Sequence, residues 1–223
     1  MIVSHRHRFI FIAVPRTATH ALRVALAPVL GPDDWQQQRL RGEQWLPVAA
    51  LARIGHGHVS CRDAAAHLPG DLWARYLRFA FVRDPFERFL SVCSFLNRGN
   101  ARFSSHPREV LHELIGRPRF AQRVLVRPQH EQLAGPDGTP DVDFIGHYER
   151  LAEDFDALCV RLGLSCKPPA RRNASPPVDA ARVWDNRLVD WVREFYAGDF
   201  EAFGYAPDWP AAVVTDQAPR VRR

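Results

Sequence analysis

Residues 9–22 have the sequence FIFIAVPRTATHAL, and this stretch decides the fold class. An uninterrupted apolar run stops at Pro15, and basic, small and hydroxyl residues follow before an amphipathic stretch begins. A short apolar run rich in Phe, Ile and Val is typical of a buried strand, and the amphipathic stretch favours a helix. The sequence therefore predicts a strand over residues 8–14, a turn, and a helix over residues 18–30.

The turn at residues 15–20 has the composition of an anion-binding loop. The first N–H groups of the predicted helix have no intrahelical acceptor, and the helix dipole favours an anion there. Arg16 adds a positive fork, and Thr17 and Thr19 add hydroxyl donors. The loop lacks the Gly-Lys-Ser/Thr core of a nucleotide-triphosphate loop, so ATP and GTP are not the expected ligands. An ordinary strand-to-helix turn capped by Thr17 is the alternative.

A second strand followed by a helix is predicted in FAFVRDPFERFLS, residues 79–91. The strand delivers Arg83 to its carboxyl end, and Ser91 follows two helical turns later. A charge-assisted Arg donor and a Ser hydroxyl suit a second phosphate. The structural alternative is a capping motif, in which Asp84 caps the helix and Arg83 pairs with Glu87.

Alternation of short strands with helices predicts an α/β fold with a mainly parallel sheet flanked by helices. The second strand is expected over residues 78–82 and a third in VDFIGHYE, residues 142–149. A helix is expected over residues 151–162. Ligands of such sheets lie outside the carboxyl ends of the strands, where both basic segments fall. We expect one domain over residues 1–205 and an irregular tail over 206–223.

The segment GHGHVS, residues 55–60, carries a candidate general base. In an extended chain residues i and i+2 face the same way, so His56 and His58 can line one cleft. Histidine titrates near neutral pH and suits proton abstraction from a hydroxyl. A Gly-rich turn with two surface histidines is the alternative. A metal site needs a third ligand, and no nearby residues supply one.

Together these segments resemble the sulfotransferase family that uses 3′-phosphoadenosine 5′-phosphosulfate (PAPS). The family pattern P-K-T-G-[GT]-T corresponds to PRTATH at residues 15–20. The pattern F-V-R-[DN]-P-x-x-R-x-x-S is matched at every defined position by residues 81–91. The resemblance spans roughly residues 8–205 and is nearest to the Golgi carbohydrate sulfotransferase branch.

The resemblance implies a P-loop-like three-layer sandwich that moves a sulfuryl group from PAPS to a hydroxyl acceptor by in-line transfer. The product is 3′,5′-adenosine bisphosphate (PAP), no metal takes part, and the expected acceptor is a glycan or glycolipid. Arg16 replaces the family's Lys, which stabilises the leaving phosphate. The implied cofactor-binding residues are Arg16, Thr17, Ala18, Thr19, His20, Arg83, Ser91 and Arg171.

The string HGHVS also resembles the region of the heparan and dermatan uronyl 2-O-sulfotransferases that carries the catalytic histidine. By position this implies His58 as the base and His56 as its neighbour, with Arg16 completing the catalytic set. The loop lacks the family's glycines. We therefore expect helical rather than left-handed dihedral angles at Ala18 and Thr19.

Two later segments have open interpretations. Gln129 and His130 lie either near the acceptor or in a solvated loop, and the loop is favoured. A late basic loop at residues 171–175 is expected to close over the adenosine half of PAPS, through Arg171 above all. A solvated Pro-rich loop is the alternative there.

Composition narrows the class of protein further. There are 30 Lys and Arg against 25 Asp and Glu, nearly all the basic residues being Arg. This suits an anionic ligand, although a GC-rich genome would produce the same excess. The basic residues are dispersed, which argues against nucleic acid.

Location and competing functions follow from what the sequence lacks. The apolar run at 9–14 is too short for a membrane span or signal peptide, and the four scattered cysteines indicate free thiols. We expect a cytoplasmic protein, and the sequence leaves its oligomeric state open.

A nucleotide phosphotransferase is disfavoured. A catalytically degenerate module that binds nucleotides or anionic glycans is the main alternative.

Overall fold

The computed structural model describes residues 1–39, 42–170 and 180–209, and these fall into two compact units. The first unit holds residues 1–83 and the described residues from 127 to 170, and the second holds 84–126 and 180–209. Each unit has its own hydrophobic core. A division into compact units does not test the predicted domain limits, so one domain over 1–205 stays a prediction.

The first unit is built on a five-stranded sheet with strand order β3-β1-β2-β4-β5. Strands β2, β4 and β5 are parallel, while β1 pairs antiparallel with both β2 and β3. The predicted mainly parallel sheet is thus confirmed, and the antiparallel edge is a feature the sequence did not indicate. The strands are β1 (Ile2–Ser4), β2 (Phe9–Ile12), β3 (Trp35–Gln36), β4 (Leu77–Val82) and β5 (Phe144–His147).

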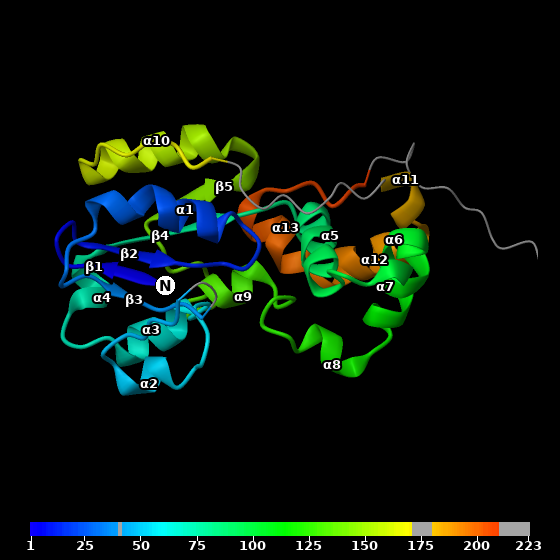
Figure 1. Ribbon diagram of the computed structural model, residues 1–223, viewed down its shortest axis with the longest axis horizontal. Helices are drawn as coiled ribbons and strands as arrows, with labels where there is room; N and C mark the ends of the chain where they lie inside the picture. Colours follow the sequence, from blue (N-terminus) through cyan, green and yellow to red (C-terminus); the bar gives the residue numbers. More distant parts are fainter. Residues whose placement is uncertain (40–41, 171–179, 210–223) are drawn as a thin grey trace, which may run out of the picture. The chain divides into compact units, whose positions relative to one another are not determined.

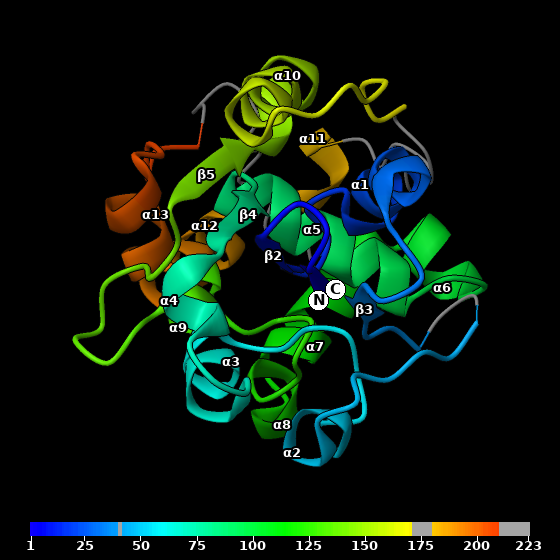
Figure 2. The same cartoon turned by 90° about the vertical axis from the view of Figure 1, so that its left-hand side faces the viewer.

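Helices cover both faces of this sheet. Figures 1 and 2 show α1 and α10 on one face and α2 and α3 on the other, which gives the predicted sandwich of three layers. The helices of this unit are α1 (Thr19–Leu26), α2 (Ala49–Ala52), α3 (Cys61–His67), α4 (Leu72–Arg75), α9 (Gln129–Leu133) and α10 (Leu151–Leu162), with 3₁₀ turns η1 (Ala27–Val29) and η2 (Tyr148–Arg150).

The apolar run that opened the analysis forms the middle of the sheet. Every residue of β2 is fully buried, as expected for a parallel strand with helices on both faces. Phe11 pairs with Phe79 of β4, and their rings stack at 5.1 Å. This register brings the carboxyl ends of β2 and β4 to the same edge of the sheet.

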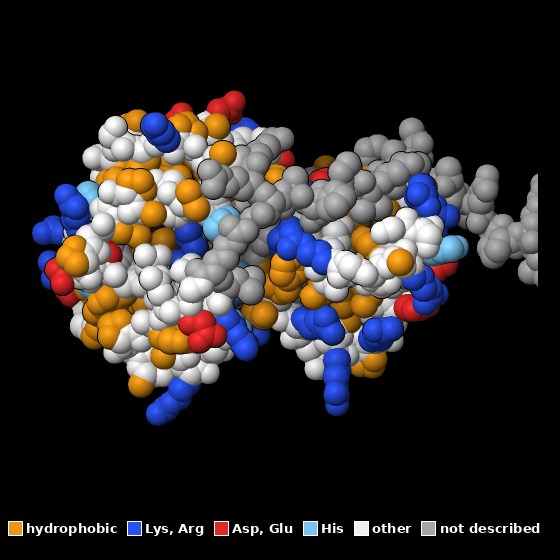
Figure 3. Space-filling view, viewed as in Figure 1, with side chains coloured by type: hydrophobic (Ala, Val, Ile, Leu, Met, Phe, Trp, Pro, Cys, Tyr) orange, Lys and Arg blue, Asp and Glu red, His pale blue; other side chains and the backbone are white. Residues whose placement is uncertain are grey.

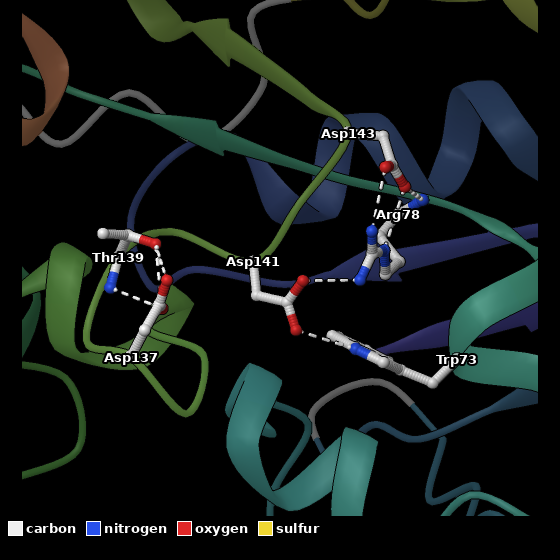
Figure 4. A network of polar contacts seen from close by, with 6 residues as sticks. All are labelled: Trp73, Arg78, Asp137, Thr139, Asp141 and Asp143. Carbon is white, nitrogen blue, oxygen red and sulfur yellow. Dashed lines mark hydrogen bonds and ion pairs between the residues drawn. The ribbon is translucent and has the colours of Figure 1, made fainter.

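A network of polar contacts ties the amino end of β4 to the chain that precedes β5 (Figure 4). Arg78 makes a bidentate pair with Asp143, with both N–O distances at 2.9 Å, and a further contact to Asp141 at 2.5 Å. Asp141 also accepts a hydrogen bond from the indole of Trp73 at 2.9 Å. The Arg78 guanidinium lowers the pKa of Asp143, so both charges are favoured in this pair. The network fixes β4 at the end opposite to Arg83.

The second unit consists of helices around an aromatic core. Its helices are α5 (Pro85–Leu96), α6 (Ala101–Ser105), α7 (Pro107–Ile115), α8 (Pro118–Ala121), α11 (Ala180–Val183), α12 (Asn186–Phe195) and α13 (Ala197–Phe203). Asp84 caps α5 by accepting from the Glu87 N–H at 2.9 Å, as the alternative of a capping motif expected. Arg88, which the second family pattern also specifies, is fully buried and donates to the Leu125 carbonyl. Its role here is to hold the unit together.

Candidate active site

The loop after β2 contains two left-handed residues that are not glycine. Arg16 has φ 66°, and Ala18 has φ 63° and ψ 20° at the N-cap of α1. The expectation of helical angles at Ala18 was therefore wrong. The left-handed conformation costs a residue with a Cβ about 1–2 kcal/mol. Loops that curl their N–H groups toward an anion need such residues, which explains why the family pattern has glycine at the position of Ala18.

Backbone N–H groups, more than hydroxyls, make this loop a donor surface. The first intrahelical bond of α1 runs from the Leu22 N–H to the Ala18 carbonyl at 3.0 Å, so the preceding N–H groups have no helical acceptor. Among the described residues, no side chain caps this helix. The alternative of a turn capped by Thr17 was therefore wrong. Thr19 and His20 lie in the open first turn, partly exposed.

The hydroxyl of Thr17 is not directed at a ligand. Thr17 is fully buried, and its Oγ1 donates to the Val14 carbonyl at 2.9 Å. This bond closes the loop on itself, and it uses the only hydrogen that the hydroxyl carries. The expected hydroxyl contact from Thr17 does not match this geometry. A contact from its backbone N–H stays a prediction.

His58 has the tautomer that a general base requires. Its Nδ1 lies 2.7 Å from the carbonyl oxygen of Ala13, at the carboxyl end of β2. A carbonyl can only accept, so Nδ1 carries the hydrogen and Nε2 carries the lone pair. No hydrogen bond to Nε2 is found among the described residues. The structure therefore joins the predicted base to the strand that leads into the anion loop.

Burial keeps this imidazole neutral. Desolvation lowers the pKa of His58 to about 3, against a smaller opposing effect of the hydrogen bond to Ala13. The nearby positive groups of Met1, His56 and Arg23 act in the same direction as burial. The pKa of His56 is lowered too, first by burial and then by Arg127. The alternative of two surface histidines is wrong.

The histidine segment is anchored through Gly57, which separates His56 and His58 in the sequence. The amino group of Met1 donates to the Gly57 carbonyl at 2.6 Å. The buried Gln37 side chain donates to the carbonyl of His56 at 2.9 Å. A Cβ on Gly57 would lie 2.6 Å from the Gln37 carbonyl oxygen, so only glycine fits. These contacts explain why an exposed-looking Gly-rich string adopts a fixed position.

Arg83 ends β4 and is held by its backbone and by an aromatic ring. The side-chain amide of Gln129 accepts from the Arg83 N–H at 3.0 Å and donates to the Arg83 carbonyl at 2.8 Å. The Arg83 guanidinium lies over the Tyr148 ring, 4.2 Å from its centre. Gln129 is fully buried on α9, so the favoured interpretation of a solvated loop was wrong.

Sequence reasoning also missed Gln132. It is 2% exposed, and its Nε2 donates to the carbonyls of Ala13 at 3.2 Å and Val59 at 3.3 Å. The available signal was the i, i+3 spacing of two glutamines in PQHEQL, which places both on one helical face. Ala13 itself carries no chemistry in its side chain, and its role comes from its carbonyl group alone.

The remaining predicted residues lie in other parts of the chain. Ser91 lies on α5 in the second unit, 8% exposed, while Arg83 lies in the first unit. Their joint contact with a phosphate stays a prediction. His130 lies on α9 and is partly exposed. Arg171 and the rest of the late basic loop lie outside the described residues.

A model of the sulfotransferase family matches residues 1–206. The chain belongs to the sulfotransferase family. This confirms the resemblance found in the two basic segments, and it makes sulfuryl transfer the general chemistry to which the site belongs. No curated protein and no solved structure gives a significant match.

Two other kinds of feature are absent from the described part of the chain. No cluster of three or more His, Cys, Asp or Glu side chains there can hold a metal ion. None of the helices in the described ranges is long and apolar enough to cross a bilayer. On the face seen in Figure 3, Lys and Arg side chains are dispersed over the surface of each unit rather than gathered into a stripe.

Proposed function

We propose that this member of the sulfotransferase family transfers the sulfuryl group of PAPS to a hydroxyl of a glycan or glycolipid, with His58 as the general base. The observation that carries the proposal is the 2.7 Å contact between His58 Nδ1 and the Ala13 carbonyl. It links a neutral histidine, with its lone pair on Nε2, to the strand that opens into the anion loop.

The residues present fit the phosphosulfate half of the donor. The open first turn of α1 supplies N–H donors, and the left-handed residues before it turn the chain toward them. Arg16 adds a positive charge in the same loop. We expect the 5′ side to be held by Arg16, Thr17, Ala18, Thr19 and His20, and the 3′-phosphate by Arg83 with Ser91.

When bound, PAPS supplies the sulfuryl group, and the broken sulfur–oxygen bond leaves its negative charge on PAP. His58 accepts the proton of the attacking hydroxyl at Nε2, while Nδ1–H stays on the Ala13 carbonyl and holds the ring. The resulting imidazolium passes its proton to solvent. Arg16 and the N–H groups of the α1 terminus stabilise the charge that develops on the leaving phosphate.

Arg16 is suited to this task by charge but differs from Lys in shape. A guanidinium keeps its charge at any working pH and can donate two parallel hydrogen bonds, whereas an ammonium acts as a point charge. We expect Arg16 to contact two phosphate oxygens at once. Arg16→Lys should retain turnover even so, since it keeps the positive charge and restores the residue that the family pattern has at this position.

Calorimetry with three nucleotides tests the donor. PAP should bind tightly, and adenosine 5′-phosphosulfate, which lacks the 3′-phosphate, should bind at least ten-fold more weakly because one charged contact is lost. Equal affinities would exclude PAPS as the donor. ATP with magnesium is the control for a phosphotransferase and should bind weakly.

A screen with labelled PAPS then separates an enzyme from a degenerate binding module. Polysaccharides, glycolipids and simple alcohols are offered as acceptors, and transfer of the label to one of them identifies the enzyme. PAP binding without transfer to any acceptor would favour the binding module.

A further inference from the structure

The five-residue helix α9 reaches both strand ends that face the candidate site. Gln129 and Gln132 are spaced i, i+3 and are both buried, at 0% and 2% exposure. Gln129 bonds to the backbone of Arg83 after β4, and Gln132 bonds to the backbone of Ala13 after β2. The helix α9 therefore binds the ends of two neighbouring parallel strands through buried side-chain amides, which packing in the hydrophobic core does not require.

Gln132 shares an acceptor with the candidate base. The Ala13 carbonyl accepts from His58 Nδ1 at 2.7 Å and from Gln132 Nε2 at 3.2 Å, which uses both of its lone pairs. The second hydrogen bond of Gln132, to the Val59 carbonyl at 3.3 Å, fixes the residue that follows His58. One amide thus fixes the carbonyl that His58 uses and the chain that carries His58.

Gln129 holds Arg83 in a different way. Its amide makes one accepted and one donated bond with the same residue, as a neighbouring strand would. The β4 backbone is therefore extended in a fixed conformation up to Arg83, and the guanidinium starts from a defined point above Tyr148.

We propose that α9 is a positioning helix with two separable roles: Gln132 positions the base His58, and Gln129 positions the anion-binding Arg83. The proposal rests on the proposed function for the meaning of the two positions. Neither glutamine needs to touch substrate. Because the amides hold different strand ends, their loss should affect different steps of the same reaction.

The test compares Gln132→Met with Gln129→Met, which remove buried amides of equal length from the same helix. Gln132→Met should lower kcat about 10–100-fold, since displacing a catalytic group by an ångström has effects of this order. Its affinity for PAP should stay within two-fold. Gln129→Met should weaken PAP binding about ten-fold and leave the pH dependence of kcat unchanged.

NMR of the imidazole nitrogens provides a readout that needs neither PAPS nor a sulfuryl acceptor. In the wild-type protein His58 should show a protonated Nδ1 and a bare Nε2 from pH 5 to 8, and Gln129→Met should keep this signature. In Gln132→Met we expect mixed tautomers and a pKa nearer to that of free histidine. This measurement separates the proposal from the proposed function, since PAP binding can fail while the tautomer result holds.

Three results would overturn the proposal. These are an Nε2-protonated His58 in the wild type, an unchanged tautomer and kcat in Gln132→Met, or the same losses from both variants, which would indicate general destabilisation. If Gln132→Met does not fold, Gln132→Asn replaces it. The shorter amide cannot span both carbonyls, so it should shift the tautomer in the same direction, and a wild-type signature in it counts against the proposal.

Discussion

The carboxyl ends of β2 and β4, at which we propose that anions bind, differ in backbone conformation and in the kind of donor that they present. After β2, the chain adopts left-handed angles at Arg16 and Ala18, and the donors are backbone N–H groups. After β4, the Gln129 amide binds the backbone N–H and carbonyl of Arg83, and the donor is the Arg83 side chain, which lies over the Tyr148 ring. Since His58 is attached only to the first end, turnover should depend on the β2 end, and nucleotide affinity should depend strongly on the β4 end.

The largest expected effect comes from removing the base. His58→Ala should lower kcat by about 10²–10⁴-fold, the usual contribution of a general base, with PAP affinity unchanged. His67, exposed at the end of α3, gives the matched control, and His67→Ala should leave kcat unaffected. A loss of PAP affinity in His58→Ala would break the comparison, because the base would then belong to the cofactor site as well.

The pH dependence of stability sharpens the same comparison without any acceptor. The pKa of His58 is lowered from 6.5 to about 3, so between these two pH values the unfolded chain binds a proton at His58 that the folded protein does not bind. Stability is therefore present above pH 6.5 and falls as the pH drops, by up to about 1.4 kcal/mol per pH unit for one such group.

Urea unfolding at pH 7, 6 and 5 measures this slope. His58→Asn removes the titrating group and should flatten the slope, and His67→Asn should keep it. His56 and the buried amino group of Met1, whose pKa values are also lowered, contribute in the same direction. An equal slope in wild type and His58→Asn would mean that His58 is not held neutral by burial.

Arg83→Ala tests the β4 end. The loss of a charged contact with phosphate costs about 1.5–3 kcal/mol, so PAP should bind roughly ten-fold to a hundred-fold more weakly. Arg75→Ala removes an exposed arginine near the other end of β4 and should leave the affinity unchanged. Tyr148→Leu should cost less, about 0.5–2 kcal/mol, because only the cation–π contact is lost. Calorimetry with PAP ranks the three variants.

The smallest effect concerns the strained loop. Ala18→Gly should raise the free energy of unfolding by about 0.5–1 kcal/mol, since relief of the left-handed strain exceeds the added freedom of the unfolded chain. Ala25→Gly, in the last turn of α1, should instead lower it by about 0.5–1 kcal/mol. Thermal unfolding of both variants gives the sign, and destabilisation by Ala18→Gly would contradict the strain at this residue.

The sequence predicted those elements whose apolar pattern and capping residues agree. The limits of α10 were predicted to the residue, and α5 begins where Asp84 and Pro85 indicate. Strands β1 and β3 were missed because they are two or three residues long, which is too short for a period to be recognised. Their existence depends on tertiary pairing, of β1 with β2 and of β3 with β1.

The candidate site combines side chains that a sequence can mark with backbone groups that it cannot. Arg16, His58 and Arg83 are marked by residue type, but the Ala13 carbonyl has no signature in a sequence. The conformation of Ala18 was predicted wrongly because intrinsic preference disfavours it, and only the closed loop makes it acceptable. Sequence alone also assigned Gln129 to a loop, since buried amides that bond to backbone resemble solvated ones in a one-dimensional pattern.

The packing between β4 and β5 disfavours a shifted register of these two strands during folding. Phe81 faces Gly146, and a Cβ on that glycine would lie 2.3 Å from the Phe81 ring. A slip by one residue would place Ile145 or His147 against the ring, where there is no room for a side chain. Parallel strands far apart in the chain pair late and slowly, when wrong registers compete. The space above Gly146 therefore favours one register of β4 against β5. This register places Arg83 beside Tyr148.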